Sequence, residues 1–279
     1  MFEPILSYIW RALSATVIQI LILLGPGLLL TIILNFETGF VQRHALNIIG
    51  KGWYLGLFGW LGTIVHELGH AIFCIIFGHK ITELKLFHPD PKTGTLGYVK
   101  HSYNSKNIYQ LAGNFFIGIG PIVLGSAVIY LLSYWLLGLN PFNLVNNLNL
   151  TSSQINSWDA IAQLLHNLGD SSGLLLKELF SWQHLFSWHL YVFIYMVFAI
   201  GSSITLSPSD IRGALGGFIV IVILIFILNL VTVWAGNFIT DFVVRIAGYC
   251  VMFYAIVFLI ILLNVAVAMF VLFLSLENH

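Results

Sequence analysis

The stretch GWLGTIVHELGHAIFCIIFG, residues 59–78, decides how the rest of the chain is interpreted. It belongs to an apolar run, 53–77, and a helix needs about 17–25 such residues to cross a bilayer. His66, Glu67 and His70 stand inside this run. Ionisable side chains are costly in hydrocarbon and usually mark a functional site. The stretch therefore predicts a membrane helix that carries a reactive centre.

The composition extends this interpretation to the whole chain. Hydrophobic residues make up 59% of the 279 residues and charged residues only 8%, whereas about 25% of a soluble domain is charged. Eleven basic residues balance eleven acidic ones, which argues against a nucleic-acid partner. Cys74 and Cys250 both lie in apolar runs, so they predict no disulfide framework. We expect a single integral membrane unit over residues 1–279, with its functional core at 53–215.

Six apolar runs are long enough to cross the lipid bilayer, and they predict an all-α polytopic membrane protein. A Gly-Pro-Gly sequence at 25–27 predicts a bend in the first run. The boundary at 207–210, between the fourth run and the fifth, is the least regular one. The six runs are 5–34, 53–77, 109–138, 185–206, 211–235 and 248–275.

The connections between these runs predict the orientation of the protein. Residues 78–108 hold five lysines against Glu83 and Asp90, whereas residues 139–184 hold one basic residue, Lys177. Positively charged connections stay on the cytoplasmic side of a membrane. We therefore expect 78–108 inside and 139–184 outside and, with six spans, both termini in the cytoplasm. The predicted location is a cell membrane or an inner membrane.

Two connections are expected to carry structure of their own. Alternating residues on both sides of PDPKTG, 89–94, predict a small cytoplasmic β-hairpin over 81–101, between the second span and the third. In the outer connection, apolar residues recur at helical spacing after Ser157, a residue type that caps helices. They predict a short helix that lies on the membrane surface or packs on the spans, and both interpretations stay open. The recurring residues are Trp158, Ile161, Leu164, Leu165 and Leu168.

The spacing of the two histidines predicts a zinc site. His66 and His70 project from one face of a helix because they are four residues apart, and Glu67 lies beside them, rotated by about 100°. In the H-E-x-x-H pattern two histidines hold zinc, and the glutamate takes a proton from the metal-bound water and passes it to the leaving amine. A chance match would leave these groups unpartnered in hydrocarbon. Cys74 lies on the same face, and we interpret it as an apolar filler rather than a ligand.

A catalytic zinc normally has three protein ligands and one open position. The two histidines lie near the C-terminal end of their span, and the fourth span, which runs parallel to it, leads to Asp210 on the same side. Pro208 breaks the helix there, and such breaks are tolerated at membrane depth only where they are buried or line a cavity. Asp210 is the predicted third ligand. Two alternatives stay open: that Asp210 only caps the next helix, and that His79 or another hairpin histidine is the ligand.

The third span contributes AGNFFIGIGPIVLG, 112–125, near its start. Small residues let a neighbouring helix approach closely, so the glycines of this stretch predict a tight helix contact. Asn114 is a candidate for orienting a substrate carbonyl group or a ligand. Plain helix packing would explain the glycines without any catalysis.

These features together resemble the site-2 protease family, the zinc intramembrane metalloproteases. The resemblance covers roughly residues 53–215 and rests on His66-Glu67-Leu68-Gly69-His70 inside a span, the Gly/Pro/Asn-bearing third span and Ser-Pro-Ser-Asp210. It implies that His66, His70 and Asp210 hold zinc and that Glu67 is the catalytic base. It also implies a membrane protein substrate, usually cut first by an upstream protease.

The chain departs from the family pattern after the aspartate. The family has a glycine directly after it, whereas Asp210 is followed by Ile211 and Arg212 before Gly213. An Asn-Pro-type segment is also missing before it. These departures put the assignment of this ligand in doubt and describe a divergent, minimal member.

Three classes of function remain open: an intramembrane zinc endopeptidase, a membrane transporter for zinc or protons, and a catalytically silent membrane scaffold. The polar groups lie at one level and no internal repeat is present, which favours the endopeptidase over the transporter. An intact Glu67 argues against the scaffold. In an endopeptidase the hairpin is expected to bind an unwound substrate strand by edge addition.

Overall fold

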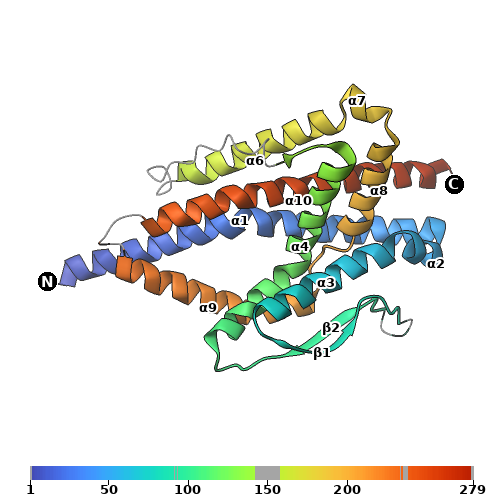
Figure 1. Cartoon of the computed structure of the whole chain (residues 1–279). Coiled ribbons are helices and arrows are strands. Elements are labelled where there is room, and N and C mark those ends of the chain that lie inside the picture. The colour runs from blue at the N-terminus through green and yellow to red at the C-terminus, as the bar shows by residue number, and fades with distance from the viewer. Residues whose placement is uncertain are drawn as a thin grey trace.

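The computed structural model describes residues 2–90, 92, 94–141, 158–232, 234 and 238–277. Within these residues the chain is mainly helical and has one two-stranded sheet (Figure 1). The helices are α1 (Phe2–Ile49), α2 (Lys51–Tyr54), the π-helical turn η1 (Leu55–Gly59), α3 (Trp60–Ile76), α4 (Ile108–Leu137), α6 (Trp158–Leu179), α7 (Trp182–Leu185), α8 (Trp188–Gly201), α9 (Pro208–Thr232) and α10 (Phe238–Glu277). The strands are β1 (Lys80–Lys85) and β2 (Tyr98–Ser102).

Five helices in the described part of the chain are long and apolar enough to cross a membrane. They contain most of the first, second, third, fifth and sixth predicted spans. The fourth predicted span, 185–206, is helical only in part, because its helix α8 has 14 residues. Such a helix rises about 21 Å, which is shorter than the hydrocarbon core of about 30 Å. The backbone leaves the helix after Gly201 and reaches α9 through six non-helical residues, Ser202–Ser207.

Helix α1 extends well beyond the predicted end of the first span at residue 34 and passes through Pro26 as one helix. Proline lacks an N–H and weakens the helical hydrogen bonds in its turn. Helix α10 packs against this turn, where the hydroxyl group of Tyr254 donates to the carbonyl oxygen of Leu23. Gly27 makes room for the contact, because a Cβ atom there would lie 2.6 Å from the ring of Tyr254. Pro26 removes the donor for the carbonyl oxygen of Ile22, and Tyr254 donates to the next carbonyl oxygen along the helix, so α10 packs on the turn that the proline weakens.

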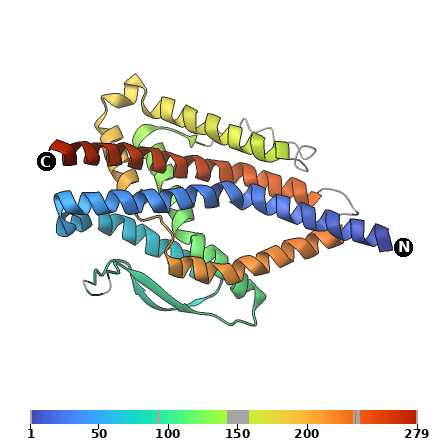
Figure 2. The same ribbon diagram turned by 180° about the vertical axis from the view of Figure 1, so that it is seen from behind.

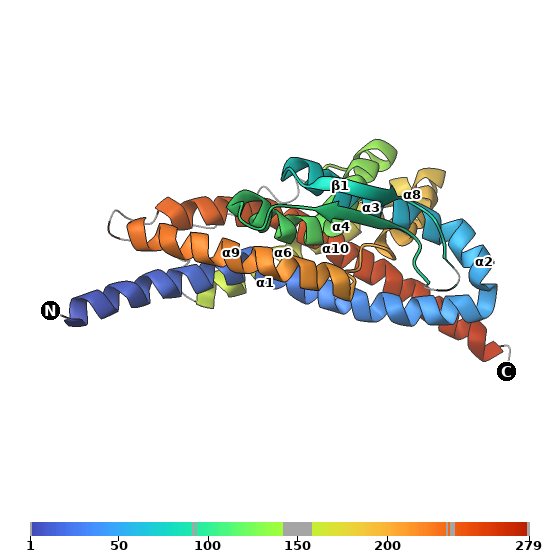
Figure 3. The same cartoon turned by 90° about the horizontal axis from the view of Figure 1, so that it is seen from below.

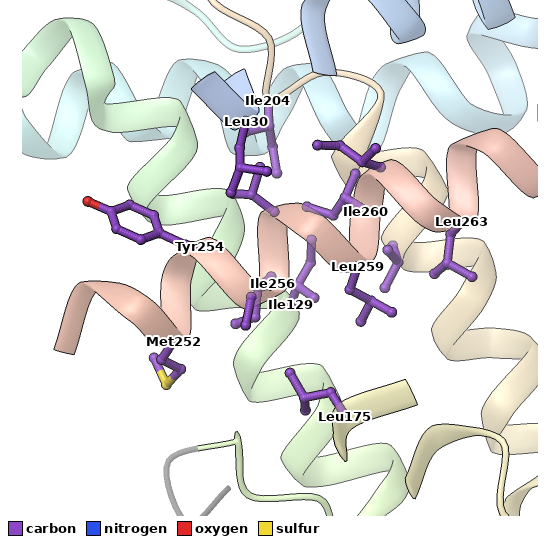
Figure 4. Close-up of a cluster of buried hydrophobic side chains, with 14 of the residues drawn as sticks. Leu30, Ile129, Leu175, Ile204, Met252, Tyr254, Ile256, Leu259, Ile260 and Leu263 are labelled. Atoms are coloured by element: carbon purple, nitrogen blue, oxygen red, sulfur yellow. The ribbon is translucent and has the colours of Figure 1, made fainter. Parts of the chain in front are cut away.

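Helix α10 forms the centre of the main apolar cluster, with α1 beside it running in the same direction (Figures 1 and 2). Side chains from α4, α6 and α8 belong to the same cluster, and Figure 4 shows Ile129 of α4 beside Ile256 of α10. Helix α6 buries one face through Leu164, Leu168, Leu175 and Leu179. Of the two interpretations of the outer connection, the structure therefore has the packed helix. The predicted cap, Ser157, lies outside the described residues.

The two strands confirm the predicted hairpin. They pair antiparallel, with Lys80 opposite Ser102 and Lys85 opposite Tyr98, and a bulge lies between Ile81 and Glu83. The hairpin extends along α3 (Figures 1 and 3). It therefore lies beside the helix that carries both predicted histidine ligands. The side of the membrane on which the hairpin lies stays a prediction.

The glycines of the third predicted span confirm the expected close helix contact. Gly120 of α4 and Gly69 of α3 meet backbone to backbone, because a Cβ atom on Gly120 would lie 2.6 Å from the carbonyl oxygen of Gly69. On the other side of α4, a Cβ atom on Gly118 would lie 2.6 Å from the Cβ atom of Ala214 in α9. Helix α4 thus holds α3 and α9 close together, and these two helices carry the predicted zinc ligands.

Candidate metal centre

The two histidines of α3 direct one ring nitrogen each to the same place. Their Nε2 atoms lie 3.2 Å apart. The Nδ1 atom of His66 lies 2.6 Å from the carbonyl oxygen of Ser203, and the Nδ1 atom of His70 lies 2.7 Å from that of Ile117. A carbonyl oxygen can only accept, so each Nδ1 carries the proton and each Nε2 of the neutral ring keeps its lone pair. This is how histidine ligands of a metal are usually oriented.

Asp210 completes a group of three potential ligands. Its Oδ1 atom lies 3.4 Å from Nε2 of His70, and its Oδ2 atom lies 3.8 Å from Nε2 of His66. One ligand atom from each residue lies within 4.8 Å of the others, and no other group of three or more His, Cys, Asp or Glu side chains does so among the described residues. Two imidazole nitrogens and one carboxylate oxygen suit zinc. The side chains therefore fit this ion, whereas the fully buried Cys74 stays outside the group.

Asp210 also caps α9. Its Oδ2 atom accepts from the backbone N–H of Ser207 at 2.8 Å, and its own N–H donates to the Oγ atom of Ser207 at 3.2 Å. This reciprocal pair is a capping box, with Pro208 at the first helical position. The capping role and the predicted ligand role are compatible, because the cap fixes the carboxylate while its other oxygen faces His70. A serine three residues before the aspartate was the sequence signal for this arrangement.

The side chain of Glu67 is buried and lines the same cavity as the three potential ligands. This cavity has a volume of about 850 Å³. The hairpin lies against it: a Cβ atom on Gly97 would be 2.8 Å from Cγ of Glu67, so this close approach needs a glycine. Asn114, buried on α4, also lines the cavity. The structure thus brings all five predicted site residues to one cavity. The roles of Glu67 and Asn114 stay predictions.

His79 lies outside this group and is bonded elsewhere. Its Nε2 atom donates to the carbonyl oxygen of Gln110 at 2.8 Å, so in the neutral ring its Nδ1 atom is an acceptor. The Nδ1 atom of His101 lies 3.0 Å away and must carry the shared proton. His79 therefore ties β2 to the start of α4 and is not placed to be the third ligand. His88 is exposed on the hairpin and is not in the group either.

Several contributors to this site have no motif in the sequence. The carbonyl oxygens of Ser203 and Ile117 belong to the backbone, so residue type does not reveal them. His101 lines the cavity and keeps an Nε2 lone pair, but its link to His79 becomes visible only when the strands are paired. Asn35 of α1 bonds the segment that precedes Asp210. A polar side chain directly after an apolar run was the only signal for it.

Comparison of the chain with protein-family models, curated proteins and solved structures finds no match in any of the three.

Proposed function

We propose that this chain is an intramembrane zinc endopeptidase that hydrolyses peptide bonds of membrane-embedded proteins. The observation that carries the proposal is the group of His66, His70 and Asp210, with Glu67 on the same cavity. Both histidines have their outer nitrogens bonded to carbonyl oxygens, which leaves two lone pairs 3.2 Å apart. Two facing lone pairs repel each other unless a proton or a cation lies between them. The resemblance to the site-2 protease family rests on the same residues.

The long apolar helices are proposed to lie in a lipid bilayer. Helix α9 carries large apolar side chains that are more than half exposed, among them Leu215 at 56% and Ile219 and Ile223 at 51% each. Contiguous apolar surface of this kind is unfavourable in water and marks a membrane or an interface. Together with the other long apolar helices, it supports a multi-pass membrane protein.

The residues of the cavity can perform amide hydrolysis. Zinc, when bound, supplies a Lewis acid that polarises the substrate carbonyl group and lowers the pKa of a water molecule. Glu67 accepts a proton from the water that attacks the carbonyl carbon, and it returns this proton to the nitrogen of the leaving amine as the C–N bond breaks. The amide group of Asn114 is proposed to donate a hydrogen bond to the substrate carbonyl oxygen. Asp210, His66 and His70 hold the ion.

The hairpin is the proposed binding site for the unwound substrate strand. The cavity lining includes the run Gly94–Val99, which leads into β2 and passes over Glu67. An extended peptide adds to such a segment through its main-chain groups. Deleting residues 88–95 is expected to abolish cleavage while zinc stays bound. Unchanged cleavage by this deletion variant would refute the edge-addition proposal and leave the metal site standing.

The test of the proposed function combines metal content with cleavage. Mass spectrometry on detergent-purified protein should find near one zinc per chain in the wild type and in Glu67→Gln, and much less in Asp210→Ala. In liposomes, the wild type should cleave a single-span reporter whose helix is weakened by Gly and Pro, and Glu67→Gln should not. A folded wild type without zinc would contradict the proposal.

These measurements, together with zinc uptake into liposomes, separate the endopeptidase from the scaffold and the transporter. Zinc without cleavage of any reporter would favour a silent scaffold. Zinc uptake into liposomes by the wild type would favour a transporter, although a transporter distributes its ligands along a path and the described residues offer only one group of three. Zinc retained in Asp210→Ala would keep the enzyme and move the third ligand elsewhere.

A further inference from the structure

The segment Ser202–Ser207, between α8 and α9, contacts two of the three proposed zinc ligands. The carbonyl oxygen of Ser203 accepts the proton of Nδ1 of His66 at 2.6 Å. The backbone N–H of Ser207 donates to Oδ2 of Asp210 at 2.8 Å. A shift of this segment would therefore rotate one ligand and displace the other. The distance between His66 and Asp210 depends on where this short piece of backbone lies.

The first half of this segment is held by turn hydrogen bonds, from the N–H groups of Ser203 and Ile204 to the carbonyl oxygens of Ile200 and Gly201. In its second half, the backbone of Leu206 is bound by one side chain from α1. Asn35 donates through Nδ2 to the carbonyl oxygen of Leu206 at 3.3 Å and accepts through Oδ1 from the N–H of Leu206 at 3.1 Å. A primary amide has an acceptor oxygen and a donor nitrogen bonded to the same carbon atom. It can therefore bond the N–H group and the carbonyl oxygen of one residue at the same time. The two bonds hold the peptide groups on both sides of the Cα atom of Leu206.

We propose that Asn35 is a positioning residue for the metal centre, acting through Leu206 on His66 and Asp210. This inference rests on the proposed zinc site. Asn35 does not line the cavity, so its effect passes through the backbone of Ser202–Ser207. Ile204 adds an apolar anchor for the same segment, since it is buried against Gly125 of α4. The bonds of Asn35 hold the backbone of Leu206, which lies between the two ligand contacts.

The test measures the metal site spectroscopically and needs no substrate. Wild type, Asn35→Leu and Thr38→Val are purified without metal and titrated with Co²⁺, whose visible absorption reports the ligand geometry. Asn35→Leu is expected to lower the Co²⁺ affinity by up to roughly 10-fold, the lower end of the loss seen for a group bonded directly to a ligand, because Asn35 acts one bond further away, and to shift the absorption band. Thr38→Val is the matched control, because Thr38 is buried on the same helix and its hydroxyl group has no hydrogen-bond partner. It should bind Co²⁺ as the wild type does.

Two outcomes distinguish the inference from the function on which it rests. If the folded wild type binds no Co²⁺ and no Zn²⁺, the proposed metal site is wrong and the inference falls with it. If the wild type binds Co²⁺ and Asn35→Leu gives the same affinity and spectrum, the metal site stands and the role of Asn35 is overturned.

A second measurement uses the wild type alone, in case Asn35→Leu does not fold. Coupling between two sites is reciprocal, so bound zinc should tighten the contact between Asn35 and Leu206. Hydrogen exchange of the Leu206 amide is expected to slow when zinc is added. Equal exchange with and without zinc would overturn the inference.

Discussion

At the scale of single residues, two successive hydrogen bonds link the carbonyl oxygen of Gln110 to His79 and His79 to His101. Through these bonds one backbone carbonyl group determines which nitrogen carries the proton in both histidine rings. The carbonyl oxygen requires a proton on Nε2 of His79, and this leaves Nδ1 of His79 to accept from His101. His101 therefore presents a lone pair on Nε2 while it lines the cavity beside the metal centre. These hydrogen bonds also join the hairpin to α4, so their loss should loosen the hairpin.

Replacing His101 with phenylalanine is expected to lower the free energy of unfolding by about 1–3 kcal/mol, because the buried Nδ1 atom of His79 then lacks a donor. Asparagine at this position can still donate and should restore part of the loss. The control is His88→Phe, on an exposed position of the same hairpin. Thermal unfolding in detergent measures all three variants. Equal losses at positions 88 and 101 would contradict the hydrogen-bond chain.

His101 also predicts a dependence of stability on pH. Burial lowers the pKa of His101 below its ordinary value, and the neighbouring His79 and His70 lower it further. The pKa of His101 is therefore lower in the folded chain than in the unfolded chain, and at a pH between these two values the unfolded chain binds the proton more readily. The contribution of neutral His101 to stability is complete above pH about 6.5 and is lost as the pH falls through the folded-state pKa. The stability advantage of the wild type over His101→Asn should shrink on acidification, measured by unfolding at a series of pH values. A stability difference between wild type and His101→Asn that increases as the pH falls would contradict a lowered pKa of His101.

Single residues differ in how far the sequence could predict them. His66, Glu67 and His70 follow from one helical motif, and Asp210 from the helix break at Pro208. Asn35 could not be assigned, because an amide side chain reveals no partner until α1 lies beside the segment before α9. The distinction between His79 and His101 likewise required the strand pairing. Local spacing thus predicted the side chains that the structure groups together, and tertiary contacts supply the groups that orient them; their role as zinc ligands stays a prediction.

At the scale of helices, glycines set how closely α4 and α9 pack. A Cβ atom on Gly217 of α9 would lie 2.4 Å from the backbone nitrogen of Phe115, whereas a Cβ atom on Gly216 would meet nothing within 4 Å. These neighbours therefore form a matched pair in one helix. One faces the α4 backbone, and the other has room for a side chain.

Gly217→Ala is expected to destabilise the protein by about 1–3 kcal/mol, because the helices must move apart. Gly216→Ala should be neutral or stabilising by up to about 1 kcal/mol, since alanine favours a helix over glycine. The two unfolding midpoints, compared under one condition, check this difference. Similar midpoints for the two variants would mean that α4 and α9 are not in backbone contact.

Helix boundaries were harder to predict than helix positions. The first span was expected to end at 34 because polar residues follow it, yet Asn35 bonds to Leu206 and Thr38 is buried, so α1 continues to Ile49. In the fourth span the residues after Gly201 are mixed, Ser-Ser-Ile-Thr-Leu, and the backbone unwinds where it meets His66 and Asn35. In both places the helix extends or ends according to tertiary contacts that hydropathy does not contain.

At the scale of the whole molecule, α1 and α10 run side by side in the same direction, and the chain begins and ends at opposite ends of the molecule (Figures 1 and 2). The prediction that both termini lie in the cytoplasm required six crossings. The described residues contain five helices of sufficient length. An odd number of crossings would place the termini on opposite sides of a membrane, so the common location depends on whether the shorter apolar helix α8 also crosses, and it stays a prediction.

If only these five helices cross, reporters fused to the two ends of the chain are expected to lie on opposite sides of the membrane. Accessibility of single cysteines to an impermeant reagent in oriented vesicles measures this directly. A cysteine in the hairpin, for example Thr82→Cys at an exposed position, then assigns the side of the metal-site mouth. Both ends on one side would mean that α8 and the segment after it complete a sixth crossing.

The two carbonyl oxygens that orient His66 and His70 have a consequence for evolution. A side-chain partner can be deleted by one nucleotide change, whereas a main-chain oxygen is present whatever residue stands at position 117 or 203. In a library of every single substitution, replacements at positions 117 and 203 should therefore act through packing, because Ile117 is buried and the side chain of Ser203 lies against Gly62, while Gly69 and Gly120, which place one of these oxygens, should tolerate few replacements. The orientation of the centre is inherited through helix spacing rather than through the identity of its nearest neighbours.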